Sequence, residues 1–371
     1  MNPTLTPQAA ARTTLFSFTG AALISATSSA PTPLYPLYRS LFHLTPTMLT
    51  LIFGAYAFAL LAALLTVGKV SDYTGRRPLM LLALAINAVA LVIFMTASSA
   101  TTLIVARLVQ GFATGIALPT FGASLIDASK TRGPLLNSFT AFLGMTLGTL
   151  AGGILVTFAP FPTVTLYALL LILMLFAMAL LPLIPETIAP QPGVLAALRP
   201  QVSIPRRALG PLLMVTPVNI ATWMLGGFYL SLMPSMVANA TGLTSPFIGG
   251  SSVATLMLIA GVSVTLTGLS LHSVAWLYLG TAIAGQGFGS IFSSVLKIIM
   301  QLAESHERAG LFSAFLIKSY LAFALPAIAA GMAAPHIGLN QTAWYYGMTI
   351  IVLALVSLLA IRGRALAGAV S

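Results

Sequence analysis

Charged side chains gather in one short stretch of a chain that is otherwise almost wholly apolar. Residues 68–80 read GKVSDYTGRRPLM, with four charged side chains: Lys69, Asp72, Arg76 and Arg77. Asp72 can accept from the first amides of a following helix and pair with either arginine. Gly68 allows close helix approach, and Gly75 permits a turn that a side chain would obstruct. The spacing predicts a turn held by charge pairs, with Asp127 the nearest further acid in the sequence.

Two other basic residues, Arg107 and Lys318, lie within long apolar runs. In a membrane such a group costs at least about 2.5–3.5 kcal/mol at the centre of a helix, so each is a functional candidate. Gln110 lies one turn from Arg107 on nearly the same face. Lys318 could carry a proton or bind an anionic substrate, or its side chain could simply extend along polar neighbours.

The acidic residues lie elsewhere. All five are found at the ends of apolar runs on the side expected to be cytoplasmic: Asp72, Asp127, Glu186, Glu304 and Glu307. No carboxylate is therefore expected at mid-depth to alternate between protonated and ionised forms. Any proton coupling would involve Asp127, Arg107, Lys318 or the substrate itself.

The composition indicates that membrane-spanning helices position these charged residues. Of the 371 residues, 58% are hydrophobic and only 6% are charged, and the mean hydropathy is +1.02. A water-soluble globule carries about a quarter charged residues, so we expect a polytopic membrane protein. The apolar runs are too long for barrel strands and predict helices. The basic residues lie in short connections, which argues against nucleic-acid binding, and the absence of cysteine excludes disulfides and thiol catalysis.

Hydropathy predicts eleven membrane segments in two unequal blocks. Six lie at 13–35, 46–67, 78–97, 101–126, 134–158 and 163–184, and five at 211–236, 247–271, 274–300, 309–333 and 342–361. The expected division is a six-helix half, 1–187, a cytoplasmic linker, 188–210, and a shortened half, 211–371. The positive-inside rule places the N-terminus in the cytoplasm.

The same rule makes the second block ambiguous. Arg207 and Lys297 are both expected inside, which requires an even number of crossings, yet three apolar runs lie between them. One interpretation makes 247–271 a re-entrant hairpin packed inside the bundle. The alternative is eleven full spans with the last basic loops outside.

The charged stretch resembles the signature loop of the major facilitator superfamily of secondary transporters, with its spacing Gly68-x-x-x-Asp72-x-x-Gly75-Arg76-Arg77. Three further motifs agree in order and depth: Arg107-Leu-Val-Gln110-Gly111, the antiporter-like glycines of span five, and Pro185-Glu186-Thr187. Those glycines are Gly144, Gly148, Gly152 and Gly153. In the second half, Phe288-Gly289-Ser290, Glu307-Arg308-Ala309-Gly310 and Ser319-Tyr320 resemble spans ten and eleven of bacterial drug-efflux members. The end of span eight, the following loop and the start of span nine have no counterpart, which predicts an internal deletion.

The resemblance implies roles for these residues. The charged loop with Asp127 would act as a conformational latch, besides serving as a topology signal. Arg107 would assist proton transfer, with a structural helix clamp as the alternative. The span-five glycines would form a gate against leakage, with close helix packing as the alternative. Independently of the resemblance, polar and aromatic residues of spans one, five, seven and ten could line a central cavity for an amphipathic substrate, with an ordinary helix contact as the alternative for each: Tyr35, Asn137, Asn219, Trp223, Tyr229 and Gln286.

The expected function is secondary transport of a drug or small metabolite, with efflux favoured and protons as a candidate coupling ion, by alternating access in a bacterial inner membrane. The expected partners are the substrate and the bilayer, the expected state is a monomer, and no cofactor or metal is expected. An enzyme is disfavoured because the four histidines are scattered and no pair of embedded acids exists. The alternative is a transport-inactive relative, suggested by the shortened second half.

Overall fold

The computed structural model describes residues 6–200, 204–231 and 308–370, together with nine positions between 266 and 280. Every element of these three ranges is helical. The first part contains α1 (Pro7–Ser29), η1 (Thr32–Leu34), α2 (Tyr35–Leu41), α3 (Pro46–Thr66), α4 (Ser71–Thr74), α5 (Arg76–Met95), α6 (Ala100–Ala128), α7 (Gly133–Phe158), α8 (Pro162–Leu180), η2 (Leu181–Leu183) and α9 (Val194–Ala197). The later part contains α10 (Arg206–Ser231), α15 (Arg308–Ile337) and α16 (Leu339–Val370).

Local capping signals set several helix starts. The Thr6 hydroxyl accepts from the amide of Ala9 at α1, and the Thr45 hydroxyl accepts from that of Met48 at α3. In both helices a proline follows the capping threonine, where its missing N–H is harmless. At α6, Ser99 and Thr102 form a reciprocal capping box. The start of α5 is different, because Gly75 has no side chain to cap it.

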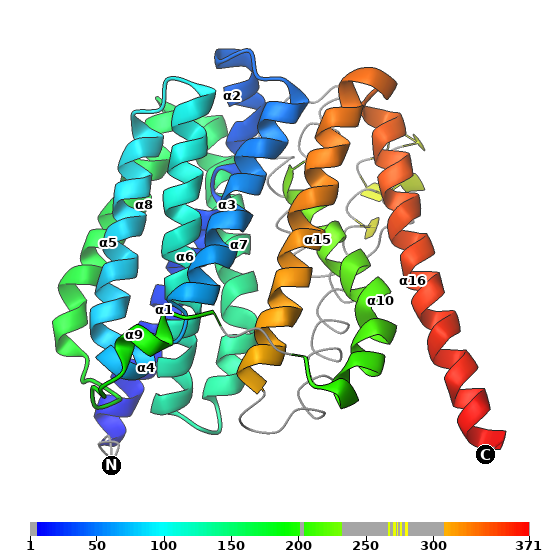
Figure 1. Ribbon diagram of the computed structural model, residues 1–371. Helices are drawn as coiled ribbons and strands as arrows, with labels where there is room; N and C mark the ends of the chain where they lie inside the picture. The colour runs from blue at the N-terminus through cyan, green and yellow to red at the C-terminus, as the bar shows by residue number, and fades with distance from the viewer. Residues whose placement is uncertain are drawn as a thin grey trace.

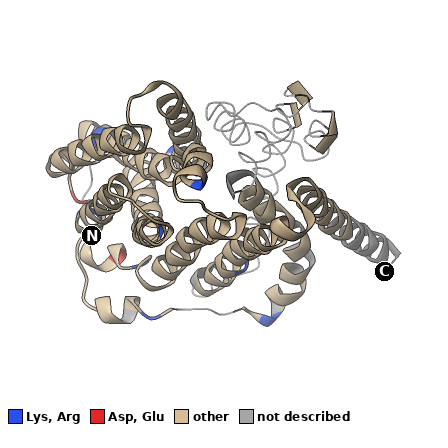
Figure 2. Ribbon diagram, turned by 90° about the horizontal axis from the view of Figure 1, so that it is seen from above, with Lys and Arg blue, Asp and Glu red and all other residues tan. Residues whose placement is uncertain are grey.

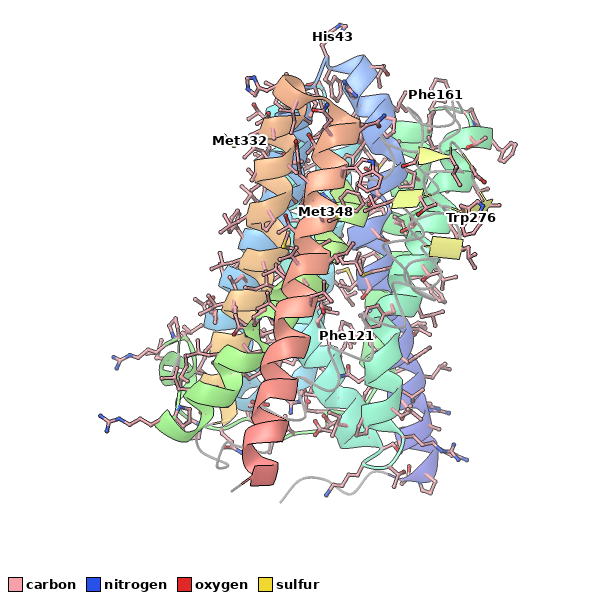
Figure 3. The ribbon with its side chains drawn as sticks, turned by 90° about the vertical axis from the view of Figure 1, so that its right-hand side faces the viewer. His43, Phe121, Phe161, Trp276, Met332 and Met348 are labelled. Atoms are coloured by element: carbon pink, nitrogen blue, oxygen red, sulfur yellow. The ribbon has the colours of Figure 1, made fainter. Side chains whose placement is uncertain are left out.

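The fold is that of an all-helical membrane protein. Seven of the described helices are long and apolar enough to cross a bilayer. Large apolar side chains project from the outside of the bundle, among them Phe161, Met332 and Met348, which are 79%, 56% and 47% exposed (Figure 3). Figure 2 shows how few charged residues the described ribbon carries. This surface suits hydrocarbon rather than water.

The helices form two groups that meet along one interface. Figure 1 shows α1, α3 and α5 to α8 on one side and α10, α15 and α16 on the other, with α3 packed against both α6 and α15. The rings of Phe53 and Phe323 lie 4.9 Å apart, and the Thr47 hydroxyl donates to the Gly331 carbonyl at 3.0 Å. The two groups are therefore in direct contact through α3 and α15.

Both ends of the chain lie at the same end of the bundle (Figure 1). The segment 247–271 lies almost entirely outside the described residues, so a re-entrant path there stays a prediction. The domain boundaries expected at residues 187 and 211 likewise stay predictions.

Candidate functional site

Arg76 is the centre of a charged cluster at the junction of α4 and α5. Its Nε donates to Asp127 Oδ2 at 3.0 Å, and its Nη1 donates to Ser71 Oγ at 2.8 Å and to Asp72. The Thr187 hydroxyl donates to the same Asp127 oxygen at 3.0 Å. The Arg76 side chain is only 7% exposed, whereas Asp72 is 51% exposed. The sequence left open which arginine Asp72 would pair with and named Asp127 as the nearest further acid. In the structure both contact Arg76, as does Ser71, and Thr187 contacts Asp127.

The missing cap of α5 comes from Glu186, more than a hundred residues away. Its carboxylate accepts from the amides of Arg76 at 2.8 Å and Arg77 at 3.0 Å. Gly75 has φ +96°, and a Cβ there would lie 2.6 Å from Glu186 Oε2. This geometry explains why the position needs glycine. The sequence interpretation gave the amide-capping role to Asp72, whereas in the structure Glu186 fills it; the Pro-Glu-Thr motif was the signal.

The Arg76 cluster, defined as Ser71, Asp72, Arg76, Asp127, Glu186 and Thr187, ties elements of the first group to one another. Its bonds join α4, α5, α6 and the chain that follows η2. Further along, the amide of Gln191 donates to the Tyr73 carbonyl at 2.7 Å, which holds the start of the expected linker against α4. The close contact of Gly68 is with the Leu64 carbonyl of its own preceding turn rather than with a facing helix.

Arg107 forms the second polar centre, inside the first group of helices. It is 1% exposed, and its Nη1 donates to the Ser28 carbonyl at 2.7 Å and to Gln110 Oε1 at 2.8 Å. Its Nη2 donates to the Tyr35 hydroxyl at 2.6 Å. Gln110 in turn donates to the Thr27 carbonyl at 2.9 Å. Arg107 and Gln110 thus hydrogen-bond to carbonyls in the last turn of α1, which have no partner within the helix.

Neutral polar groups surround Arg107. Its guanidinium carbon lies 5.7 Å and 5.3 Å from the ring centres of Tyr35 and Tyr56, a distance suited to cation–π attraction. None of the described carboxylates pairs with Arg107. The position and the spacing with Gln110 were predicted from sequence; the role of Tyr35 as a partner of Arg107, rather than as part of a cavity wall, was not.

Lys318 lies within α15 and faces α10. Its Nζ donates to the Thr216 hydroxyl at 3.0 Å and lies 5.6 Å from the centre of the Phe315 ring. One residue further along α15, the Ser319 hydroxyl accepts from the side-chain amide nitrogen of Asn219, on α10, at 2.9 Å. A lysine is therefore held inside a spanning helix by a neutral hydroxyl and an aromatic ring.

The expected cavity residues divide between several environments. Trp223 packs against Tyr320, 4.8 Å between ring centres, beside the Phe53–Phe323 contact, whereas Asn137 is exposed on α7. Gln286 and the side chain of Tyr229 lie outside the described residues. The structure thus brings Asn219 and Trp223, but not Asn137, close to Lys318 and the contact between α3 and α15.

The span-five glycines lie against the backbone of α1. A Cβ at Gly144 would overlap the Ala22 carbonyl, one at Gly148 the Ala26 carbonyl, and one at Gly152 would lie 2.9 Å from the Ala30 oxygen. Gly153 is buried on the same helix. This contact shows close helix packing, as small residues commonly provide in membranes.

Comparison with known proteins identifies a matching family and several structures with a similar fold. Residues 17–269 match the sequence model of the Major Facilitator Superfamily. A bacterial homologue of the human lysosomal transporter Spinster, inward-facing and unoccupied, is 13% identical with a TM-score of 0.76, over 95% of this chain and 97% of that one. The nucleoside transporter NupG, as a variant, is 12% identical with a TM-score of 0.71 over 95% and 99%. A D-xylose–proton symporter is 14% identical with a TM-score of 0.69 over 93% and 96%. A comparison with curated protein sequences found no match.

Proposed function

Because the chain belongs to the Major Facilitator Superfamily, we propose that it is a secondary transporter that exports a drug or small metabolite, with protons as the coupling ion. Residues 1–187 and 211–371 would rock against each other around a site near the midplane, with 188–210 as the linker. We place the protein in a bacterial inner membrane as a monomer with a cytoplasmic N-terminus, in accord with its basic loops.

The observation that carries this proposal is the position of Lys318. Its described partners are neutral, so no ion pair in the described residues offsets the free energy of placing an ammonium group within the membrane. Two residues further along α15, Tyr320 packs against Trp223 at the contact between the helix groups. A charge placed there can respond to the movement of one group against the other. We infer that Lys318 binds the substrate or carries the coupling proton.

The test is transport by purified protein in proteoliposomes with an imposed pH gradient, using a panel of lipophilic cations, organic anions and small metabolites. We expect gradient-driven movement of at least one compound by the unaltered chain. Lys318→Met should abolish this movement, and Lys318→Arg should retain part of it because the charge remains. The matched control is Lys130→Met, which removes an exposed lysine from the loop before α7 and should leave transport unchanged.

The same assay separates a transport-inactive protein from a working one. Movement that survives Lys318→Met would contradict the role of the lysine but not transport itself. A folded protein that binds a compound yet never moves it, in either direction, would contradict the transporter proposal.

A further inference from the structure

A basic cavity lies outside both polar centres, where the first turns of α1, the start of α5, and η2 with the residues after it come together. Its volume is about 340 Å³, close to the lower end of the range for small-molecule sites. Arg12 of α1 and Arg77 of α5 line it, together with Leu183, Ile184 and two prolines. Arginines far apart in the sequence thus converge on one hollow.

The charge of this cavity is positive and uncompensated by its walls. None of its described lining residues is acidic. The nearby carboxylate of Glu186 accepts from the backbone amides of Arg76 and Arg77, so it faces the helix end rather than the Arg77 side chain. Arg77 uses one of its five N–H donors on the Pro182 carbonyl, at 3.4 Å. The remaining donors of both guanidinium groups suit a phosphate or carboxylate.

The position along the bundle indicates where such an anion would come from. The apolar span of α5 begins at Arg76, and that of α8 and η2 ends at Leu183. The cavity therefore lies at the level where the hydrocarbon of the bilayer meets the lipid headgroups. Leu183, which is 67% exposed, offers an apolar surface beside the two arginines. A lipid would present its phosphate to the arginines and its acyl region to this leucine.

We propose that this cavity binds the phosphate headgroup of an anionic phospholipid of the surrounding leaflet. Basic pockets between spanning helices recognise such headgroups through charge and hydrogen bonding. The bound lipid links the ends of α1 and α5 to η2 next to the Arg76 cluster. This site is independent of the transported substrate and of the coupling ion.

The test is native mass spectrometry of the full chain in detergent, titrated with phosphatidylglycerol or phosphatidylcholine. We expect saturable binding of phosphatidylglycerol at one site and weaker binding of phosphatidylcholine. Arg12→Gln combined with Arg77→Gln should weaken phosphatidylglycerol about 30-fold, since each arginine near an anionic headgroup contributes about 1 kcal/mol and 1.4 kcal/mol is tenfold. The control Arg132→Gln removes an exposed arginine near the same end of the bundle and should change nothing.

A second variant tests the cavity itself. Ala9 lines it, so Ala9→Leu fills the space while both arginines remain, and it should also weaken phosphatidylglycerol. This variant serves as well if the double substitution reduces folding. Equal loss in Arg132→Gln, equal binding of the two lipids, or unchanged binding in Ala9→Leu would overturn the proposal. Displacement of the lipid by inorganic phosphate at equal concentration would indicate a free-anion site and would also overturn it.

Discussion

At the scale of single residues, Arg107 caps the C-terminal end of α1. Its guanidinium reaches the Ser28 carbonyl, Gln110 and the Tyr35 hydroxyl at once, which only a planar fork of donors can do. These bonds support the clamp interpretation of Arg107 over a freely accessible proton carrier. The role in proton transfer stays a prediction.

Replacing Arg107 by lysine tests the clamp. The ammonium keeps the charge but cannot reach all three partners, and each hydrogen bond to a charged group contributes about 1.5–3 kcal/mol. We expect the free energy of unfolding in mixed micelles to fall by about 2–4 kcal/mol. Arg39→Lys, at an exposed arginine of α2, should change it by less than about 0.5 kcal/mol. Equal stability of the two variants would contradict the clamp.

Glu186 and Asp72 offer a second comparison between residues. Glu186 caps α5 through two backbone amides, whereas Asp72 is half exposed and pairs with one side chain. We expect Glu186→Gln to lower the free energy of unfolding by about 1 kcal/mol, and Asp72→Asn by less, because solvent screens exposed pairs. The same micelle titration measures both variants. A larger loss of unfolding free energy in Asp72→Asn than in Glu186→Gln would indicate that Asp72, rather than Glu186, stabilises the start of α5.

At the scale of elements, the close packing of α7 against α1 determines how a substitution at a glycine of α7 affects stability. Gly148 lies against the Ala26 carbonyl, so a methyl group there must push the two helices apart. We expect Gly148→Ala to lower the free energy of unfolding by about 1–3 kcal/mol, as overpacking does. Gly210→Ala is the matched control, because nothing lies within 4 Å of a Cβ at that helical position. It should be neutral or stabilise by up to about 1 kcal/mol. Equal effects would show that the close contact is unimportant.

At the scale of the whole molecule, the interface of α3 with α15 tests the proposed function, since the alternating access proposed above requires contacts between the two groups of helices to open. A Cβ on Gly331 would lie 2.8 Å from that of Thr50, closer than the roughly 3.5–4.5 Å found in disulfides, so a disulfide here requires a small shift of α15 away from α3. The chain has no native cysteine, so Thr50→Cys with Gly331→Cys can form one defined bond. We expect oxidation to stop transport and reduction to restore it, with both single variants active. Full transport by the cross-linked protein would show that this contact stays closed throughout the cycle.

The sequence by itself determined the class of protein and most helix positions in the first group. Hydropathy is a local property, so the run expected at 46–67 appears as Pro46–Thr66 and the run at 134–158 as Gly133–Phe158. Motif spacing likewise placed Gln110 near Arg107, because the two lie one turn apart on the same helix, and it placed Asp72 near the arginine pair Arg76 and Arg77 because they are close in the sequence. The family match confirmed the resemblance on which the superfamily assignment depended.

Only the tertiary structure decided which distant groups complete each site. Glu186 reaches Arg76 across 110 positions, and Tyr35 reaches Arg107 across 72. Arg12 and Arg77 share a cavity although they lie on different helices. No local pattern encodes such pairings, because they depend on how helices cross and rotate when they pack. For the same reason hydropathy could mark Lys318 as unusual, but packing alone assigned it the Thr216 hydroxyl as its partner.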